Sequence, residues 1–173
     1  LALEPALRQQ LEIVTKCDIK LLSAKYPERT VKHYDTSAAH IAYSVDNSLQ
    51  NLGTDYLDLL LIHRPDPLMN ADEVADAFVQ LKQSGKVRHF GVSNFTPYQF
   101  DLLQSRLDFP LVTNQVEVNP VNIFALHDGT LDQMQMKRIR PMIWSALGGG
   151  SIFTAQTEQA HRLRTVLGNV SEE

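Results

Sequence analysis

The sequence contains one cysteine, no long apolar run and little net charge, and each scarcity excludes a class of protein. Cys17 cannot form a disulfide within the chain, which favours a reducing, cytoplasmic location. No stretch approaches the roughly 18 apolar residues that span a bilayer, so we expect no membrane partner. The net charge of −4 offers no basic surface to nucleic acid. The sequence leaves the oligomeric state open.

Several functional motifs are also missing. Neither G-x-G-x-x-G nor G-x-x-x-x-G-K-[ST] occurs, which argues against a Rossmann fingerprint and a P-loop. The lack of G-x-S-x-G removes support for a serine hydrolase. The histidines other than His63 show no zinc spacing, and we therefore predict no metal site. These histidines are His33, His40, His89, His127 and His161.

What remains is a chain of 173 residues, 43% apolar and 21% charged, long enough for one well-buried domain over residues 1–173. Five apolar runs predict buried strands, and segments of helical periodicity separate them. The predicted strands are residues 11–17, 56–63, 87–94, 111–118 and 141–147.

Helix-end signals support the segments between these strands. Gly53 stands where a helix commonly ends in the left-handed conformation. Asn70 and Glu73 have the spacing of a capping pair. Thr96, Pro97 and Gln99 suit the cap, first and third positions of another helix, and further helices are predicted from Thr130 and over residues 155–167.

Alternating strands and helices predict a parallel sheet, which leaves two architectures: a doubly wound open sheet or a (β/α)8 barrel. From Ile13 to Met142, four strand-to-strand intervals average about 32 residues, and eight such units would need roughly 250 residues, the usual size of the barrel. The α/β chain therefore predicts an incomplete TIM-type barrel of five units.

In such a barrel, function gathers at the carboxyl ends of the strands. Each predicted strand ends in polar or aromatic side chains, and each has a plain reading: a solvated lysine, a packed histidine, loop amides and a core tryptophan. The alternative readings are a lysine of shifted pKa or a Schiff-base lysine, a histidine that polarises a carbonyl, and an indole that stacks on a ligand. The strand-end residues are Lys16, His63, Ser93, Asn94, Gln115, Trp144 and Ser145. Glycines 148–150 suit a flexible turn or an approach to phosphate.

Four segments resemble barrel strands of the aldo-keto reductase family, in the right order. Residues 13–16 (IVTK) are similar to the third strand and residues 56–63 (YLDLLLIH) to the fourth. Residues 85–95 (GKVRHFGVSNF) resemble the fifth strand and residues 114–117 (NQVE) the sixth. The resemblance is to a bacterial oxidoreductase branch and implies that the chain covers about strands 3 to 7.

The resemblance implies transfer of a hydride from NADPH to a small aldehyde or ketone. Family members use a tyrosine as general acid with a lysine, an aspartate and a histidine; Lys16 and His63 match the lysine and the histidine. The lysine would lower the pKa of the tyrosine, and the histidine would orient the carbonyl.

The same register implies a set of cofactor contacts. Ser93, Asn94 and Gln115 would bind the nicotinamide carboxamide, and Trp144 would stack on the ring. Ser145, Leu147 and Gly148 would approach the pyrophosphate.

The family's tyrosine and aspartate would precede Leu1, and the segment that grips the adenosine phosphate would follow Glu173. No tyrosine of this sequence occupies the acid's position: Tyr26, Tyr34, Tyr43, Tyr56 and Tyr98 all lie elsewhere. We therefore expect the 173 residues alone to be inactive, with open sheet edges at residues 11–17 and 141–147. Two alternatives remain: a non-catalytic truncated relative or cofactor-binding regulatory subunit lacking that tyrosine and aspartate, and a barrel lyase that uses Lys16 as a Schiff base.

Overall fold

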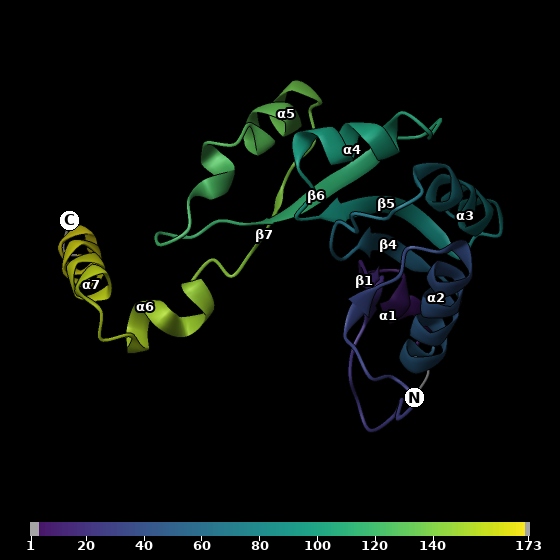
Figure 1. Cartoon of the computed structure of the whole chain (residues 1–173), viewed down its shortest axis with the longest axis horizontal. Helices are drawn as coiled ribbons and strands as arrows, with labels where there is room; N and C mark the ends of the chain where they lie inside the picture. The colour runs from purple at the N-terminus through teal and green to yellow at the C-terminus, as the bar shows by residue number, and fades with distance from the viewer. Residues whose placement is uncertain (1–3, 172–173) are drawn as a thin grey trace. The chain divides into compact units, whose positions relative to one another are not determined.

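The computed structural model describes residues 4–171 (Figure 1). The chain forms two compact units, residues 1–114 (unit 1) and 115–173 (unit 2). One strand, β6 (Leu111–Glu117), runs through the boundary between them. The single domain expected over residues 1–173 stays a prediction.

Unit 1 alternates strands with helices in the predicted order. Its longer strands are β1 (Val14–Cys17), β4 (Leu57–Ile62), β5 (Val87–Ser93) and the start of β6. Its helices are α1 (Pro5–Arg8), α2 (Ala38–Leu52), α3 (Ala71–Gln83) and α4 (Pro97–Gln104). A short antiparallel pair that the sequence analysis did not predict, β2 (Ile19–Lys20) and β3 (His33–Tyr34), lies between β1 and α2.

The strands of unit 1 are parallel neighbours, as predicted. β1 pairs with β4, with Lys16 opposite Leu61, and β4 pairs with β5, with Leu61 opposite Gly91. The five-stranded sheet has the order β1-β4-β5-β6-β7. Each strand therefore neighbours the next long strand along the chain. That sequential order is typical of a barrel, whereas a doubly wound sheet reverses its direction at a switch point.

The caps explain where the helices begin and end. Gly53 follows α2 with φ 60°, the left-handed conformation predicted for it. The Asn70 side chain accepts hydrogen bonds from the amides of Asp72 and Glu73 and so caps α3. The carboxylate of Glu73 differs from the expected capping pair, because it accepts from the amide of Ala38 at the start of α2, at 2.8 Å. One side chain thus links the starts of two helices.

The predicted capping box of α4 is present in full. Thr96 accepts from the amide of Gln99, and the Gln99 side chain accepts from the amide of Thr96 at 2.9 Å. Phe95 and Phe100, which flank this box, are both buried. Their burial fixes the direction in which the chain leaves β5 and enters α4.

The core of unit 1 lies between the sheet and its helices. Phe78 of α3 stacks on Phe90 of β5, with ring centroids 4.3 Å apart, and both side chains are fully buried. Gly91 marks the tightest approach between strands: a Cβ there would lie 2.8 Å from both Leu61 Cδ2 and the Thr113 carbonyl oxygen. Only glycine fits this position without moving a neighbouring strand.

A cluster of charges closes the amino-terminal ends of β1 and β4. The Arg8 guanidinium donates to the Asp58 carboxylate at 2.7 Å and to the Tyr56 carbonyl at 2.8 Å. Asp58 also accepts from the Ile13 amide at 2.9 Å and from Arg88 at 3.1 Å. Both guanidinium groups lie over the Tyr56 ring, 3.7 and 3.8 Å from its centroid. We call these residues the Arg8 cluster.

Unit 2 is built from shorter elements. Strand β7 (Met142–Trp144) pairs in parallel with the end of β6, with Gln115 opposite Met142 and Glu117 opposite Trp144. The strand is shorter than the predicted 141–147, because the chain turns from residue 145 onward. The other elements are η1 (Phe124–Leu126), α5 (Thr130–Met136), η2 (Gly148–Gly150), α6 (Ser151–Thr154) and α7 (Glu158–Ser171).

Within residues 4–171, no helix is both long enough and apolar enough to cross a membrane.

Candidate active site

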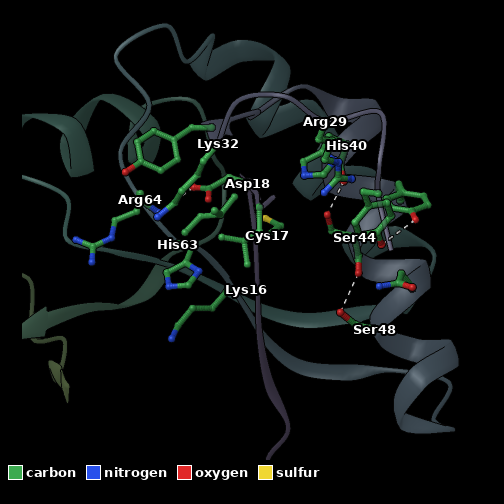
Figure 2. Close-up of a pocket in the computed structure, with 16 residues that line it drawn as sticks. Lys16, Cys17, Asp18, Arg29, Lys32, His40, Ser44, Ser48, His63 and Arg64 are labelled. Atoms are coloured by element: carbon green, nitrogen blue, oxygen red, sulfur yellow. Dashed lines mark hydrogen bonds between the residues drawn. The ribbon is translucent and has the colours of Figure 1, made fainter. Parts of the chain in front are cut away.

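Lys16 and His63 lie at the carboxyl ends of the neighbouring strands β1 and β4. Lys16 is opposite Leu61 in the register, so the alternation of a strand directs Lys16, Leu61 and His63 to one face of the sheet. The His63 amide donates to the Cys17 carbonyl at 3.2 Å, which extends the pairing past the end of β4. Figure 2 shows both side chains on the same side of the cavity. The structure brings together these two predicted catalytic residues.

The environment of His63 favours its neutral form. Partial burial lowers its pKa, and the positive charges of Lys16, Arg64 and Lys32 lower it further. A neutral imidazole can donate one hydrogen bond to a carbonyl oxygen without carrying a charge. His63 is therefore suited to orient and polarise a carbonyl.

Asp18 is a buried carboxyl group that sequence reasoning missed. It directly follows β1, is fully buried, and has φ 92°. Its Oδ2 accepts from the Arg64 amide at 2.8 Å, whereas Oδ1 has no hydrogen-bond partner among the described residues. Burial raises the pKa of Asp18 to about 7, against the opposing effect of nearby backbone amides. The signal for it in the sequence was only its position two residues after Lys16.

A cavity of about 610 Å³ surrounds the end of β1 in unit 1. Lys16, Asp18 and His63 line it, together with residues of α2 and of the segment between β1 and α2 (Figure 2). Three of the tyrosines that the family register set aside also line this cavity, namely Tyr26, Tyr34 and Tyr43.

Two of these tyrosines interact directly. The hydroxyl groups of Tyr26 and Tyr43 lie 3.5 Å apart. That contact lowers the pKa of Tyr26, and Lys25 and Arg29 lower it further. The Arg29 guanidinium also lies over the Tyr26 ring, 3.7 Å from its centroid.

Ser93 and Asn94 lie at the end of β5. The Asn94 amide nitrogen donates to the Ser93 hydroxyl at 2.8 Å, and Asn94 adopts a left-handed backbone conformation with φ 59°. Asn114, which is fully buried in β6, holds Phe95, the residue that follows Asn94. The Asn114 side chain accepts from the Phe95 amide and donates to the Phe95 carbonyl, the latter at 2.8 Å. Sequence reasoning missed this supporting role of Asn114, although it precedes the predicted Gln115.

Unit 2 contains the other predicted cofactor residues. The register of β6 and β7 directs Gln115 and Trp144 to one face of this strand pair. Ser145, with φ 55°, starts the turn that contains Leu147 and Gly148. The Gly148 amide donates to the Ser145 carbonyl at 2.7 Å, and the Gly150 amide donates to the Leu147 carbonyl at 3.0 Å. Two amides of the triple glycine are therefore already used within the turn.

The model of the aldo/keto reductase family matches residues 1–167. This match covers nearly the whole sequence, and the chain belongs to the aldo-keto reductase family. The expected resemblance is therefore confirmed.

Curated relatives support the bacterial branch. The chain is 60% identical to the oxidoreductase YdhF of Escherichia coli over 173 residues, which are 100% of this chain and 57% of that protein. It is 51% identical to a 6-dehydroglucose reductase of Agrobacterium fabrum over 150 residues, which are 87% of this chain and 50% of that protein. The chain thus spans about half the length of the curated relatives it matches.

Solved structures confirm the fold. The glycerol dehydrogenase AKR11B4 of Gluconobacter oxydans matches with a TM-score of 0.74 at 28% identity, over 85% of this chain and 44% of that one. The thermostable aldo-keto reductase Tm1743 matches with a TM-score of 0.73 at 27% identity, over 95% of this chain and 54% of that one. The predicted incomplete (β/α) barrel is therefore confirmed, and the doubly wound alternative is excluded.

Proposed function

We propose that this chain carries part of the active site of a cytoplasmic, NADPH-dependent aldo-keto reductase, which reduces a small aldehyde or ketone. The observation that carries the proposal is the placement of Lys16 and His63 on one face, at the carboxyl ends of adjacent parallel strands. These residues match the family's catalytic lysine and histidine in sequence, and they line one cavity.

His63 would donate a hydrogen bond to the substrate's carbonyl oxygen, which becomes more basic as the carbonyl is reduced. A preorganised donor at that position stabilises the developing negative charge. Lys16 would lower the pKa of the acid that finally protonates this oxygen. The three cavity tyrosines are phenols in the same cavity as Lys16, although none matches the family's acid in sequence.

Bound NADPH would supply the hydride. Ser93, Asn94 and Gln115 offer hydroxyl and amide groups that match the donor and acceptor groups of a carboxamide. The hydrogen bond between Asn94 and Ser93, together with the fixed backbone at Phe95, shows that this strand end is already ordered.

Trp144 offers an aromatic face for stacking on the nicotinamide ring. Ser145, Leu147 and Gly148 belong to the turn that the family register assigns to the pyrophosphate. A phosphate there would compete with the hydrogen bonds of the Gly148 and Gly150 amides within the turn. We therefore expect the backbone at these glycines to rearrange when the pyrophosphate binds.

The test is transfer of a label in the complete protein that contains this chain. NADPH carrying deuterium at C4 of the nicotinamide is incubated with an aldehyde, and the alcohol is analysed by mass spectrometry. Deuterium on the former carbonyl carbon is the expected result. Binding of NADPH without transfer to any of a broad panel of carbonyls would favour the non-catalytic relative. Trapping of a substrate on Lys16 by borohydride would favour the lyase.

A further inference from the structure

The cavity beside Lys16 is strongly cationic, although the whole chain has a net charge of −4. Its lining includes four side chains with fixed positive charge and a single carboxyl group, that of Asp18. Burial raises the pKa of Asp18 to about 7, so this carboxyl group compensates only part of the positive charge near neutral pH. The four cations are Lys16, Arg29, Lys32 and Arg64.

The cations are not equivalent. Arg29 is stacked on Tyr26 and lies 3.7 Å from the Glu28 carboxylate, so its charge is partly compensated. Nearby Lys20, which is outside the lining, is paired with Asp35. Among the described residues, in contrast, neither Lys16 nor Lys32 makes an ion pair.

Positive charges gather around His63. Lys16, Arg64 and Lys32 are the three groups whose positive charges act on its imidazole. They come from three separate segments, which only the fold brings together (Figure 2). A further acid, Asp66, acts on Asp18 through its charge. Its two oxygens accept from the Thr36 hydroxyl and the Leu68 amide, and it does not line the cavity.

From this arrangement we infer that the substrate carries an anionic group, a carboxylate or a phosphate, which Lys32 and Arg64 bind while His63 holds the carbonyl. This inference rests on the proposed function and names the class of its substrate. A guanidinium can bind a carboxylate or a phosphate through two parallel hydrogen bonds, and a lysine adds a mobile point charge. Asp18 Oδ2 accepts a hydrogen bond from the Arg64 amide at 2.8 Å, which holds the backbone from which the Arg64 side chain extends.

A cationic cavity also attracts an anionic substrate before contact. Fields of one sign inside a cleft raise the local concentration of the oppositely charged ligand, and salt screens this effect. A substrate selected by charge should therefore lose its advantage at high ionic strength, whereas a neutral analogue of the same shape should not.

The test compares matched substrates with the complete protein. 4-Carboxybenzaldehyde is compared with its methyl ester, and glyceraldehyde 3-phosphate with glyceraldehyde, at low and high salt. We expect kcat/KM to be at least tenfold higher for the anionic member of at least one pair at low salt. The pair that shows the preference identifies carboxylate or phosphate as the group recognised.

Two variants assign the effect to the cavity. Lys32→Gln should lower kcat/KM for the preferred anionic substrate about tenfold, the scale of about 1.4 kcal/mol for one charge contact, and change that for its neutral partner less than twofold. Lys86→Gln removes a partly exposed lysine that directly precedes β5 and does not line the cavity, and it should change neither value.

The outcomes separate this inference from the proposed function. Equal turnover of both members of each pair, or an equal loss for both in Lys32→Gln, would overturn the inference and leave the reductase intact. If no carbonyl is reduced, the proposed function fails, and calorimetry of 4-carboxybenzoate and of phosphate with the protein then decides. Binding that weakens about tenfold in Lys32→Gln would still support the anion site, and no binding by wild type would overturn it.

Discussion

The two ends of strands β1 and β4 differ in how far their positive charges are paired with acidic groups. At their amino ends, Arg8 is buried and its guanidinium is matched by Asp58 and by backbone carbonyls. At their carboxyl ends, Lys16 and Lys32, a residue of the segment between β2 and β3 that lines the same cavity, are exposed and make no ion pair among the described residues. In this family's fold, the amino ends of the strands serve stability and the carboxyl ends carry the chemistry. The uncompensated charge thus lies where a ligand is expected.

The largest expected effect is a loss of carbonyl reduction, which depends on all the residues at the carboxyl ends of the strands. The 173 residues expressed alone should show no steady NADPH oxidation with an aldehyde panel, whereas the complete protein should be active. A positioned acid must protonate the oxygen after hydride transfer, and no tyrosine here matches the family's acid. Turnover by the isolated chain would contradict this. Tyr26→Phe, Tyr34→Phe and Tyr43→Phe would then identify which cavity phenol donates the proton.

At the amino end, Arg8→Ala should lower the free energy of unfolding by about 3–5 kcal/mol in urea titrations. The change leaves Asp58 partly buried with only Arg88 as a cationic partner and removes four hydrogen bonds of Arg8. Lys86→Ala is the matched control, because it breaks an exposed pair with Asp46 and should cost about 0–1 kcal/mol. Similar losses for both variants would show that the Arg8 cluster is ordinary surface charge.

His63→Ala should lower turnover of the complete protein by roughly 100-fold, the scale for removing a group that polarises a carbonyl. Cofactor affinity should change little, because the proposed contact is with the substrate. Single-turnover rates and titration of NADPH binding measure the two separately. Loss of cofactor binding with normal turnover of the bound fraction would assign His63 to the cofactor instead.

Asp18 predicts a pH dependence of stability at the carboxyl end. Its pKa is about 7 in the folded chain and 3.8 for the free group, so the folded state binds more protons between these values. The free energy of unfolding should therefore fall as pH rises from about 4 to about 7, by on the order of 2 kcal/mol. Asp18→Asn should flatten this dependence. A dependence that is identical in the variant would assign it to other groups.

The smallest effect is expected at Trp144. NADP⁺ should quench the fluorescence of this single tryptophan in the complete protein, and Trp144→Ala should weaken cofactor binding by about 1–2 kcal/mol. Trp144→Phe keeps an aromatic face and should recover part of that loss. Unchanged fluorescence at saturating cofactor would indicate that Trp144 packs within the protein and does not stack on the nicotinamide.

Local patterns in the sequence were enough to predict the order of the five strands of the parallel sheet and of the main helices between them, but not the short pair β2 and β3. The cap at Asn70, the box at Thr96 and the left-handed Gly53 each depend on hydrogen bonds within a few residues, so a short window of sequence encodes them. The predicted strand 11–17 was too long because its first residues follow α1 as a connection, and pairing with β4 begins only at Val14.

The sequence by itself determined which residues stand at the strand ends, because strand length and period are local properties. Only the tertiary structure decided what surrounds them. It buried Asp18, joined Arg8 to Asp58 across 50 positions, and gathered Lys16, Lys32 and Arg64 around His63. The reason is physical: burial and Coulomb interactions depend on distance in space, and the parallel pairing of β1 with β4 sets that distance.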